Sequence, residues 1–257
     1  MIRDSFQKIQ LIIGLFLFIL HCANAQFGNE SSEDDSYKSE FVLGVNFNTN
    51  GGLIGGGMFK YSQKLEKKEQ HFQSFALEIV NIKHPKEQLS VSPFTGISFV
   101  YGKRNYLFIV RPQYGREFVL FKKAREQGIQ VNFIGAGGIC LGLAAPYMIR
   151  YDDPNDPNDN LQDYVQFDPK KHKDPDFIRD TGGPFKGLSN AQINPGLNLK
   201  ASLSFEFGVI KSSVSGFEAG LNLDFFTKKI IMFDIVKPEG RSYYSSIFLT
   251  FFFGGRN

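Results

Sequence analysis

Apolar and polar side chains alternate along most of the chain from Phe41 onward. The clearest stretch is 197–207, where Leu, Ala and Phe occupy the odd positions and Asn, Lys, Ser and Glu occupy the even positions. A period of two residues places one class of side chain on each face of a β-strand. The alternation therefore predicts an all-β fold.

The same pattern recurs in segments separated by charged or turn-forming residues such as Asn50-Gly51-Gly52. Adjacent segments joined by short turns run in opposite directions, so we expect eight antiparallel strands of about ten residues each. They are expected at 41–48, 53–61, 74–82, 105–114, 129–143, 197–207, 217–225 and 243–253.

Charged residues lie near the middle of the polar faces: Glu78, Arg111, Lys200, Glu206, Glu218 and Asp224. A soluble barrel that binds an apolar ligand would carry apolar side chains there. A narrow barrel with lipid outside explains the charges, because they can pair with one another inside it. We therefore predict an eight-stranded transmembrane β-barrel whose interior is plugged by a structural network of these side chains.

The connections differ in length on the two sides of this barrel. With the N-terminus in the periplasm, the outward connections are 50–52, 83–103, 146–196 and 227–242, and the inward turns are 63–70, 115–128 and 208–211. Long outward loops and short periplasmic turns are typical of outer-membrane barrels. The longest connection, 146–196, is too polar and too rich in proline for a core element.

Two further features of the strand at 105–114 give local expectations. Tyr106 and Tyr114 lie on one face, spaced so that they fit two aromatic girdles at the edges of an apolar band. Pro112 lacks a backbone donor, so we expect a β-bulge at that residue or a strand end just before Tyr114.

Residues 1–25 have the form of a signal peptide. Arg3 and Lys8 precede an apolar run at 11–20, and Ala23-Asn24-Ala25 is a cleavage site of small residues. The alternatives are a lipoprotein anchored through Cys22 and an uncleaved anchor. Residues 26–40 are polar and acidic and read as a flexible leader, so the barrel domain is expected to span 41–257.

Composition excludes several classes of protein. The chain is 42% hydrophobic, which rules out general disorder, and its two cysteines rule out a disulfide scaffold. A net charge of +3 gives no electrostatic case for nucleic acid binding. The 28 Phe and 26 Gly favour strands packed at close range over helices.

The chain resembles the small outer-membrane β-barrel proteins of Bacteroidota bacteria. The resemblance rests on the signal peptide, the strand set and the aromatic last strand, YYSSIFLTFFFGG at 243–255. Many such proteins end on an aromatic residue that the barrel-assembly machinery recognises, whereas here Gly254-Gly255-Arg256-Asn257 follow Phe253. Some members of the group serve the type IX secretion system. The resemblance therefore implies, as a secondary hypothesis, that this protein has a role in that system.

The expected function is a structural or accessory role in the outer membrane. The expected partners are membrane lipids and lipopolysaccharide, the barrel-assembly machinery, and envelope or secretion proteins, with no nucleic acid and no cofactor. The alternatives are a small-solute channel or transporter, and a secreted soluble β-barrel that binds an apolar ligand.

Other candidate chemistry is weaker. The run at 152–160 could present Asp and Asn oxygens to Ca²⁺, but it has neither the glycine nor the closing glutamate of a calcium loop, so no metal site is assigned. His71, His84 and His172 have no serine spaced to form a catalytic pair, and we expect no enzymatic activity.

Overall fold

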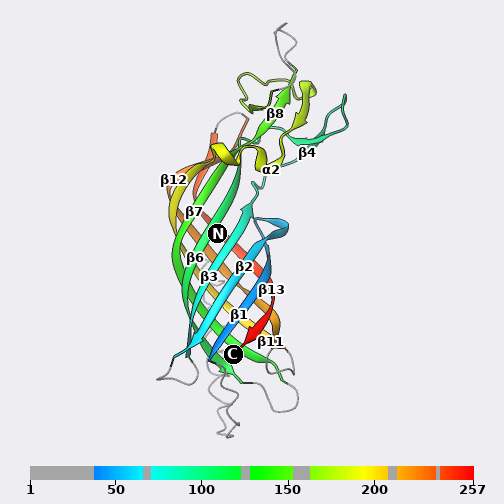
Figure 1. Ribbon diagram of the computed structural model, residues 1–257. Coiled ribbons are helices and arrows are strands. Elements are labelled where there is room, and N and C mark those ends of the chain that lie inside the picture. Colours follow the sequence, from blue (N-terminus) through cyan, green and yellow to red (C-terminus); the bar gives the residue numbers. More distant parts are fainter. Residues whose placement is uncertain (1–37, 66–70, 123–127, 153–162, 208–212, 236–237) are drawn as a thin grey trace, which may run out of the picture. The chain divides into compact units, whose positions relative to one another are not determined.

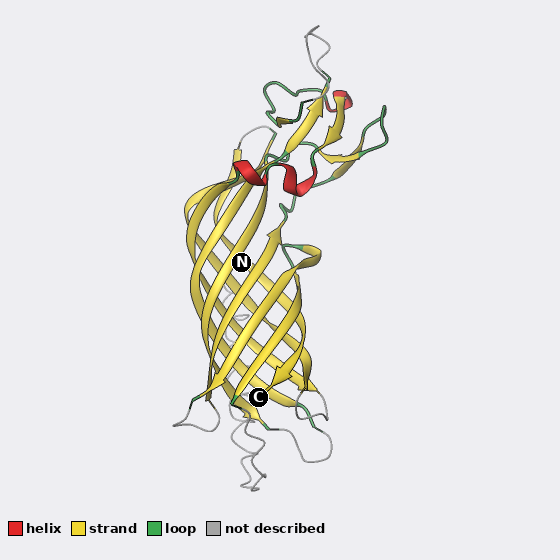
Figure 2. Cartoon of the chain, in the orientation of Figure 1, coloured by secondary structure: helices red, strands yellow, loops and turns green. Residues whose placement is uncertain are grey.

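The computed structural model describes residues 38–65, 71–122, 128–152, 163–207, 213–235 and 238–257. The prediction of an all-β, antiparallel fold is confirmed, with strands dominating the described chain (Figure 2). Within these residues, no helix is both long enough and apolar enough to cross a membrane.

The main sheet closes on itself. Around the barrel, the strand order is β1-β13-β12-β11-β7-β6-β3-β2, and β2 pairs with β1 again (Figure 1). The strands are β1 (Ser39–Asn48), β2 (Gly52–Lys64), β3 (His71–Ile82), β6 (Asn105–Phe121), β7 (Gln130–Pro146), β11 (Gln192–Phe207), β12 (Ser213–Asp234) and β13 (Pro238–Arg256).

The alternation of the sequence sorts side chains between the two faces of this sheet. In β1, Phe41, Leu43 and Val45 lie outside, each about 40% exposed, while Val42 and Asn46 are buried inside. The outer face is apolar on every barrel strand, and exposed examples are Phe59, Phe75, Leu77, Ile139, Leu199, Leu221, Leu223, Ile247, Phe251 and Phe253.

The barrel interior is not polar throughout, which differs from the prediction. One end holds an apolar cluster of Val80, Ile82, Leu107, Ile109, Cys140, Ala144, Phe226, Ile230, Met232 and Tyr244. Leu107 and Ile109 share the inward face of β6 with Arg111. Apolar side chains therefore fill the end that carries the long connections, while charges lie in the middle and at the other end, beside a smaller apolar cluster of Val42, Met58, Val214 and Phe252.

Two long connections fold together at that end. They contain β4 (Leu89–Val91), β5 (Ser98–Val100), β8 (Met148–Tyr151), β9 (Val165–Gln166), η1 (Pro175–Phe177), β10 (Ile178–Thr181), α2 (Gly183–Lys186) and η2 (Leu188–Asn190). β8 continues directly from β7 and joins β9 and β10 in a small sheet beyond the barrel (Figure 1). We call the described residues of 83–104 and 147–191 the cap.

The cap has its own core, so the expectation that 146–196 holds no core element is wrong. Phe99 of one connection packs with Tyr147, Ile149, Tyr151, Phe167 and Ile178 of the other. Tyr106 also packs against this cluster and lies 5.5 Å from Tyr147 between ring centroids. Tyr106 therefore supports the cap and is not the free girdle residue that its spacing from Tyr114 suggests.

Several strands run further than predicted. β12 and β13 pair as far as Asp234 and Pro238, so the expected loop 227–242 is largely strand, with a bulge between Phe225 and Ile230. β6 likewise continues to Phe121, and β1 begins at Ser39, two residues inside the expected leader. In the sequence, these extensions resemble loops because they carry charged residues. A strand that projects beyond the apolar outer face can carry such residues, since its side chains face water.

Pro112 causes neither the expected bulge nor a strand end. β6 pairs with β7 in the same register on both sides of it, Val110 with Leu141 and Tyr114 with Gly137. On the opposite edge, Pro112 stays in register with Leu77 of β3. Gly138 aids this fit, because a Cβ there would lie 2.2 Å from the Pro112 carbonyl oxygen.

Closure of the barrel at β1 and β13 depends on a glycine, which gives a testable prediction. A Cβ on Gly254 would lie 1.8 Å from the backbone oxygen of Phe41, whereas a Cβ on Gly57 meets nothing closer than 3.8 Å. We expect Gly254→Val to destabilise the barrel by about 2 kcal/mol or more through this backbone clash. Urea unfolding in detergent micelles measures the effect. Gly57→Val is the matched control, and equal stability of the two variants would contradict the role of Gly254.

Candidate functional site

A bidentate ion pair lies at the centre of the barrel interior. Arg111 of β6 donates from Nε and Nη2 to the two carboxylate oxygens of Asp224 on β12, at 2.9 and 2.6 Å. Its Nη1 donates to Glu78 of β3 at 3.3 Å. All three side chains are almost fully buried, so the pairing offsets a large desolvation cost.

Lys200 of β11 extends this pair into a chain of charges. Its Nζ lies 2.7 Å from Glu78 Oε1 and 2.8 Å from Glu218 Oε1. The Ser202 hydroxyl donates to the same Glu218 oxygen at 2.7 Å, and the Phe248 ring lies 5.0 Å from Nζ. One ammonium group therefore holds two carboxylates from opposite strands.

Amide side chains complete the coordination of these charges. Asn198 donates from Nδ2 to Asp224 Oδ1 at 2.9 Å, and Gln113 donates to Asn198 Oδ1. Because an amide group both donates and accepts, it can link a buried carboxylate to the next strand without adding charge.

A second buried pair was not found from the sequence. Lys60 of β2 lies 3.1 Å from Glu117 of β6, and the Ser62 hydroxyl donates to Glu117 at 2.7 Å. Glu117 falls within the expected inward turn at 115–128. The glycines at 55–57 interrupt the alternation next to Lys60, so its inward position was not recognised. The position of Lys60 between the outward Phe59 and Tyr61 was the available signal.

At the far end of the barrel, Arg256 of β13 joins two carboxylates. It donates to Glu40 of β1 at 2.8 Å and also to Glu206 of β11. The structure thus places all six sequence-derived residues inside the barrel, but in two separate groups, with Glu206 apart from the other five. Arg256 belongs to the four residues that follow Phe253, where many of the proteins that the chain resembles end on an aromatic residue. One of these additional residues therefore takes part in the buried ion pairs.

These groups fill the interior and share their cations. In the described barrel, Arg111, Lys200 and Arg256 each contact two carboxylates. Among the described residues, removing Lys200 leaves Glu218 without a contacting cation while Glu78 keeps Arg111, whereas removing Glu206 leaves Arg256 in contact with Glu40.

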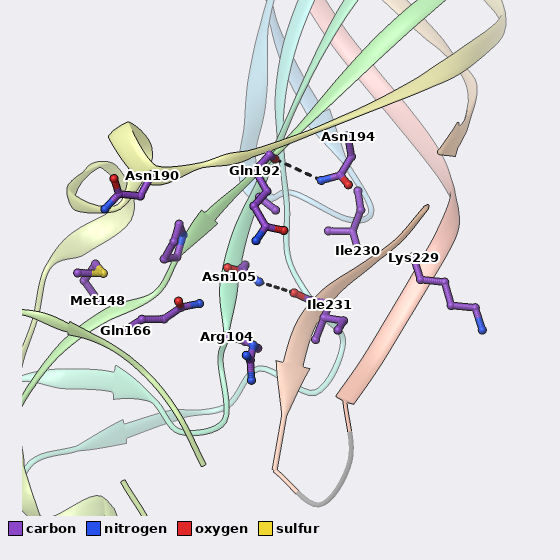
Figure 3. A pocket seen from close by; sticks show the side chains of 12 residues that line it. Arg104, Asn105, Met148, Gln166, Asn190, Gln192, Asn194, Lys229, Ile230 and Ile231 are labelled. Carbon is purple, nitrogen blue, oxygen red and sulfur yellow. Dashed lines mark hydrogen bonds between the residues drawn. The ribbon is translucent and has the colours of Figure 1, made fainter. Parts of the chain in front are cut away.

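A polar pocket lies at the end of the barrel that carries the cap (Figure 3). It encloses about 380 Å³, and its walls come from β6, β7, β8, β9, η2, β11 and β12. Arg104 lies on this wall and donates to Asp234 at 3.0 Å. Nearby in the cap, burial lowers the pKa of Lys103 from its ordinary value, although the Glu87 carboxylate 2.7 Å away opposes that change.

The other candidate groups take structural positions. His84 stacks on Phe233 with a centroid distance of 5.2 Å, and His172 Nδ1 accepts from the Asp168 backbone N–H. His71 contacts the Phe118 ring. Asp152 pairs with Arg179, but the rest of the run that was considered for Ca²⁺, 153–160, lies outside the described residues. Among those described, no group of His, Cys, Asp or Glu could hold a metal ion.

Comparisons with known proteins give distant structural likenesses. No family model matches the chain, and no curated protein matches it. Neisserial surface protein A has 4% identity and a TM-score of 0.41, with 85% of this chain and 96% of that chain covered. The attachment invasion locus protein Ail of Yersinia pestis has 10% identity and a TM-score of 0.40, with 86% and 99% covered. The N-terminal β-barrel domain of Pseudomonas aeruginosa OprF has 8% identity and a TM-score of 0.31, with 84% and 98% covered.

The sharing of cations predicts unequal effects from two substitutions in the interior. Lys200→Leu should cost about 3–5 kcal/mol of unfolding free energy, because the buried Glu218 loses its ammonium partner and Glu78 keeps only Arg111. Glu206→Leu should cost less, because Arg256 keeps its contact with Glu40.

Chemical unfolding of both variants in detergent micelles measures the difference. Leu199→Met, on the outer face next to Lys200, is the control and should be nearly neutral. An unchanged midpoint for Lys200→Leu would contradict the buried network.

Proposed function

We propose that this protein is an integral outer-membrane protein, an eight-stranded transmembrane β-barrel with a plugged interior and a structural or accessory role. The observation that carries the proposal is the segregation of side chains across one sheet. Apolar residues are exposed around the outside of the barrel, while paired charges are buried inside it.

The outer face is difficult to reconcile with water. Leu197 and Ile247 are each 61% exposed and Leu221 is 56% exposed, and they belong to an apolar surface shared by all the barrel strands. Soluble monomers rarely expose a continuous apolar patch of this extent. A bilayer removes the conflict, because lipid tails solvate the outer face and closure leaves no unpaired strand edge inside the membrane.

The interior favours a plug over a conduit. Arg111, Asp224, Lys200 and Glu218 cross the middle of the barrel, and the apolar cluster around Leu107 and Phe226 fills the end beside the cap. A small barrel is normally filled by its own side chains in this way. A channel role would require these pairs to separate.

In this proposal, protein partners bind to the surface of the cap. It lies at the end of the barrel where the two long connections meet, which we assign to the outside of the cell. Membrane lipids and lipopolysaccharide would contact the barrel, and envelope or secretion proteins would contact the cap or the turns at the other end. The proposed role in type IX secretion rests on the sequence resemblance alone.

A pair of arginine substitutions tests the membrane assignment. Leu221→Arg should reduce folding stability in lipid vesicles by about 2–4 kcal/mol, because it places a charge against lipid tails. Leu89→Arg is the control, since Leu89 of β4 in the cap is 76% exposed and should tolerate the charge. Equal, small effects at both positions would contradict a lipid-facing belt.

Liposome swelling tests the plugged interior. Purified protein reconstituted into liposomes should give no swelling in small sugars above that of protein-free liposomes. Swelling that falls with solute size would replace the structural role with a channel or transporter. Recovery of the protein from the soluble periplasm without detergent would instead favour the soluble ligand-binding barrel.

A further inference from the structure

The pocket at the cap end of the barrel is rich in side-chain amides. Seven separate elements build its walls, and five of its side chains are amides: Asn105, Gln166, Asn190, Gln192 and Asn194 (Figure 3). These residues lie far apart in the sequence, so the fold itself gathers them. The function proposed above does not use them.

Most of these amides have unused hydrogen-bonding capacity. Asn105 donates to the Ile231 carbonyl at 2.7 Å and Asn194 donates to the Gln192 carbonyl at 3.2 Å, which leaves both side-chain oxygens available. Among the described residues, the side chains of Gln166, Asn190 and Gln192 have no hydrogen-bond partner. The pocket therefore offers donors and acceptors side by side.

The charges of the pocket are largely compensated. Arg104 is paired with Asp234, and the ammonium group of Lys229 points away from the other labelled side chains in Figure 3. None of the described residues that line the pocket carries a carboxylate. A phosphate group only accepts hydrogen bonds in its ionised form and would leave the amide oxygens unsatisfied, whereas a hydroxyl group both donates and accepts.

Apolar groups also line the pocket. Pro146, Met148 and Ile231 are only half-buried and present C–H surface next to the amides. A sugar ring combines a hydroxyl-bearing edge with a C–H face, so both kinds of wall have a counterpart on one ligand. The volume of about 380 Å³ lies near the lower end for small-molecule sites.

We propose that this pocket binds a small neutral saccharide, or the end of a longer saccharide chain, through Gln166, Gln192 and their neighbouring amides. The amides hold the hydroxyl groups, and the apolar wall packs on the ring. The proposal depends on the pocket alone, so its failure would leave the membrane proposal standing.

Isothermal titration calorimetry on the full-length mature chain tests this proposal. The protein is kept in lauryldimethylamine oxide micelles, because maltoside detergents carry a competing sugar. Maltose, lactose and N,N′-diacetylchitobiose are the neutral probes, and glucose 6-phosphate is the anionic probe. We expect saturable binding of at least one neutral disaccharide, with no gain in affinity for the phosphate.

Gln166→Ala and Gln192→Ala should each weaken that binding about three- to tenfold, because each removes a hydrogen-bonding amide. Both side chains are exposed, so the variants should keep the parent unfolding midpoint. Gln73→Ala, which removes a half-buried amide on the outer face of β3, outside the pocket, is the control and should leave the Kd unchanged.

Each remaining outcome overturns the proposal. These outcomes are no binding of any neutral probe, binding of the phosphate alone, and equal affinity of the parent and both pocket variants. Asn190→Ala provides a further variant in a different element should either glutamine variant lose stability.

Discussion

The shared ion pairs of Arg111 and Lys200 are the constraint on which the rest of the barrel depends. Their carboxylate partners come from β3 and β12, strands that face each other across the interior only when the sheet closes. Buried charges without partners are strongly destabilising, so an open or slipped sheet would leave these groups unpaired. The network thus favours a single strand register in a closed barrel. The same side chains occupy the interior through which a solute would otherwise pass.

The alternation of the sequence was sufficient to assign side chains to faces but not to define partners. It placed Glu78 and Lys200 on the polar face, yet pairing across the interior depends on strand tilt and order. Lys60, Glu117 and Arg256 were missed because glycines, a charged stretch and the chain end disguised their strands. The core of the cap was missed because its apolar residues, such as Tyr147, Phe167 and Ile178, stand singly among polar residues, and only the fold brings them together with Phe99 of the other connection.

The two ends of the barrel have different chemistry. At one end, Arg256 joins Glu40 and Glu206 close to short connections. At the other, the apolar interior around Leu107 supports the cap and a pocket lined by amides. A filled barrel that presents a folded cap would suit recognition at a membrane surface, as the proposed accessory role requires, without transport.

Spin labels on the outer face test the central claim, that lipid surrounds this barrel, most directly. Single cysteines at Leu199, Leu221 and Ile247, in a Cys140→Ser background, would carry nitroxides in protein reconstituted into bilayers. We expect dissolved oxygen to relax these labels strongly and a water-soluble nickel chelate to leave them unaffected, with the opposite result for a label at Leu89 in the cap. Equal access of the nickel chelate to Leu221 and Leu89 would contradict a lipid-surrounded barrel.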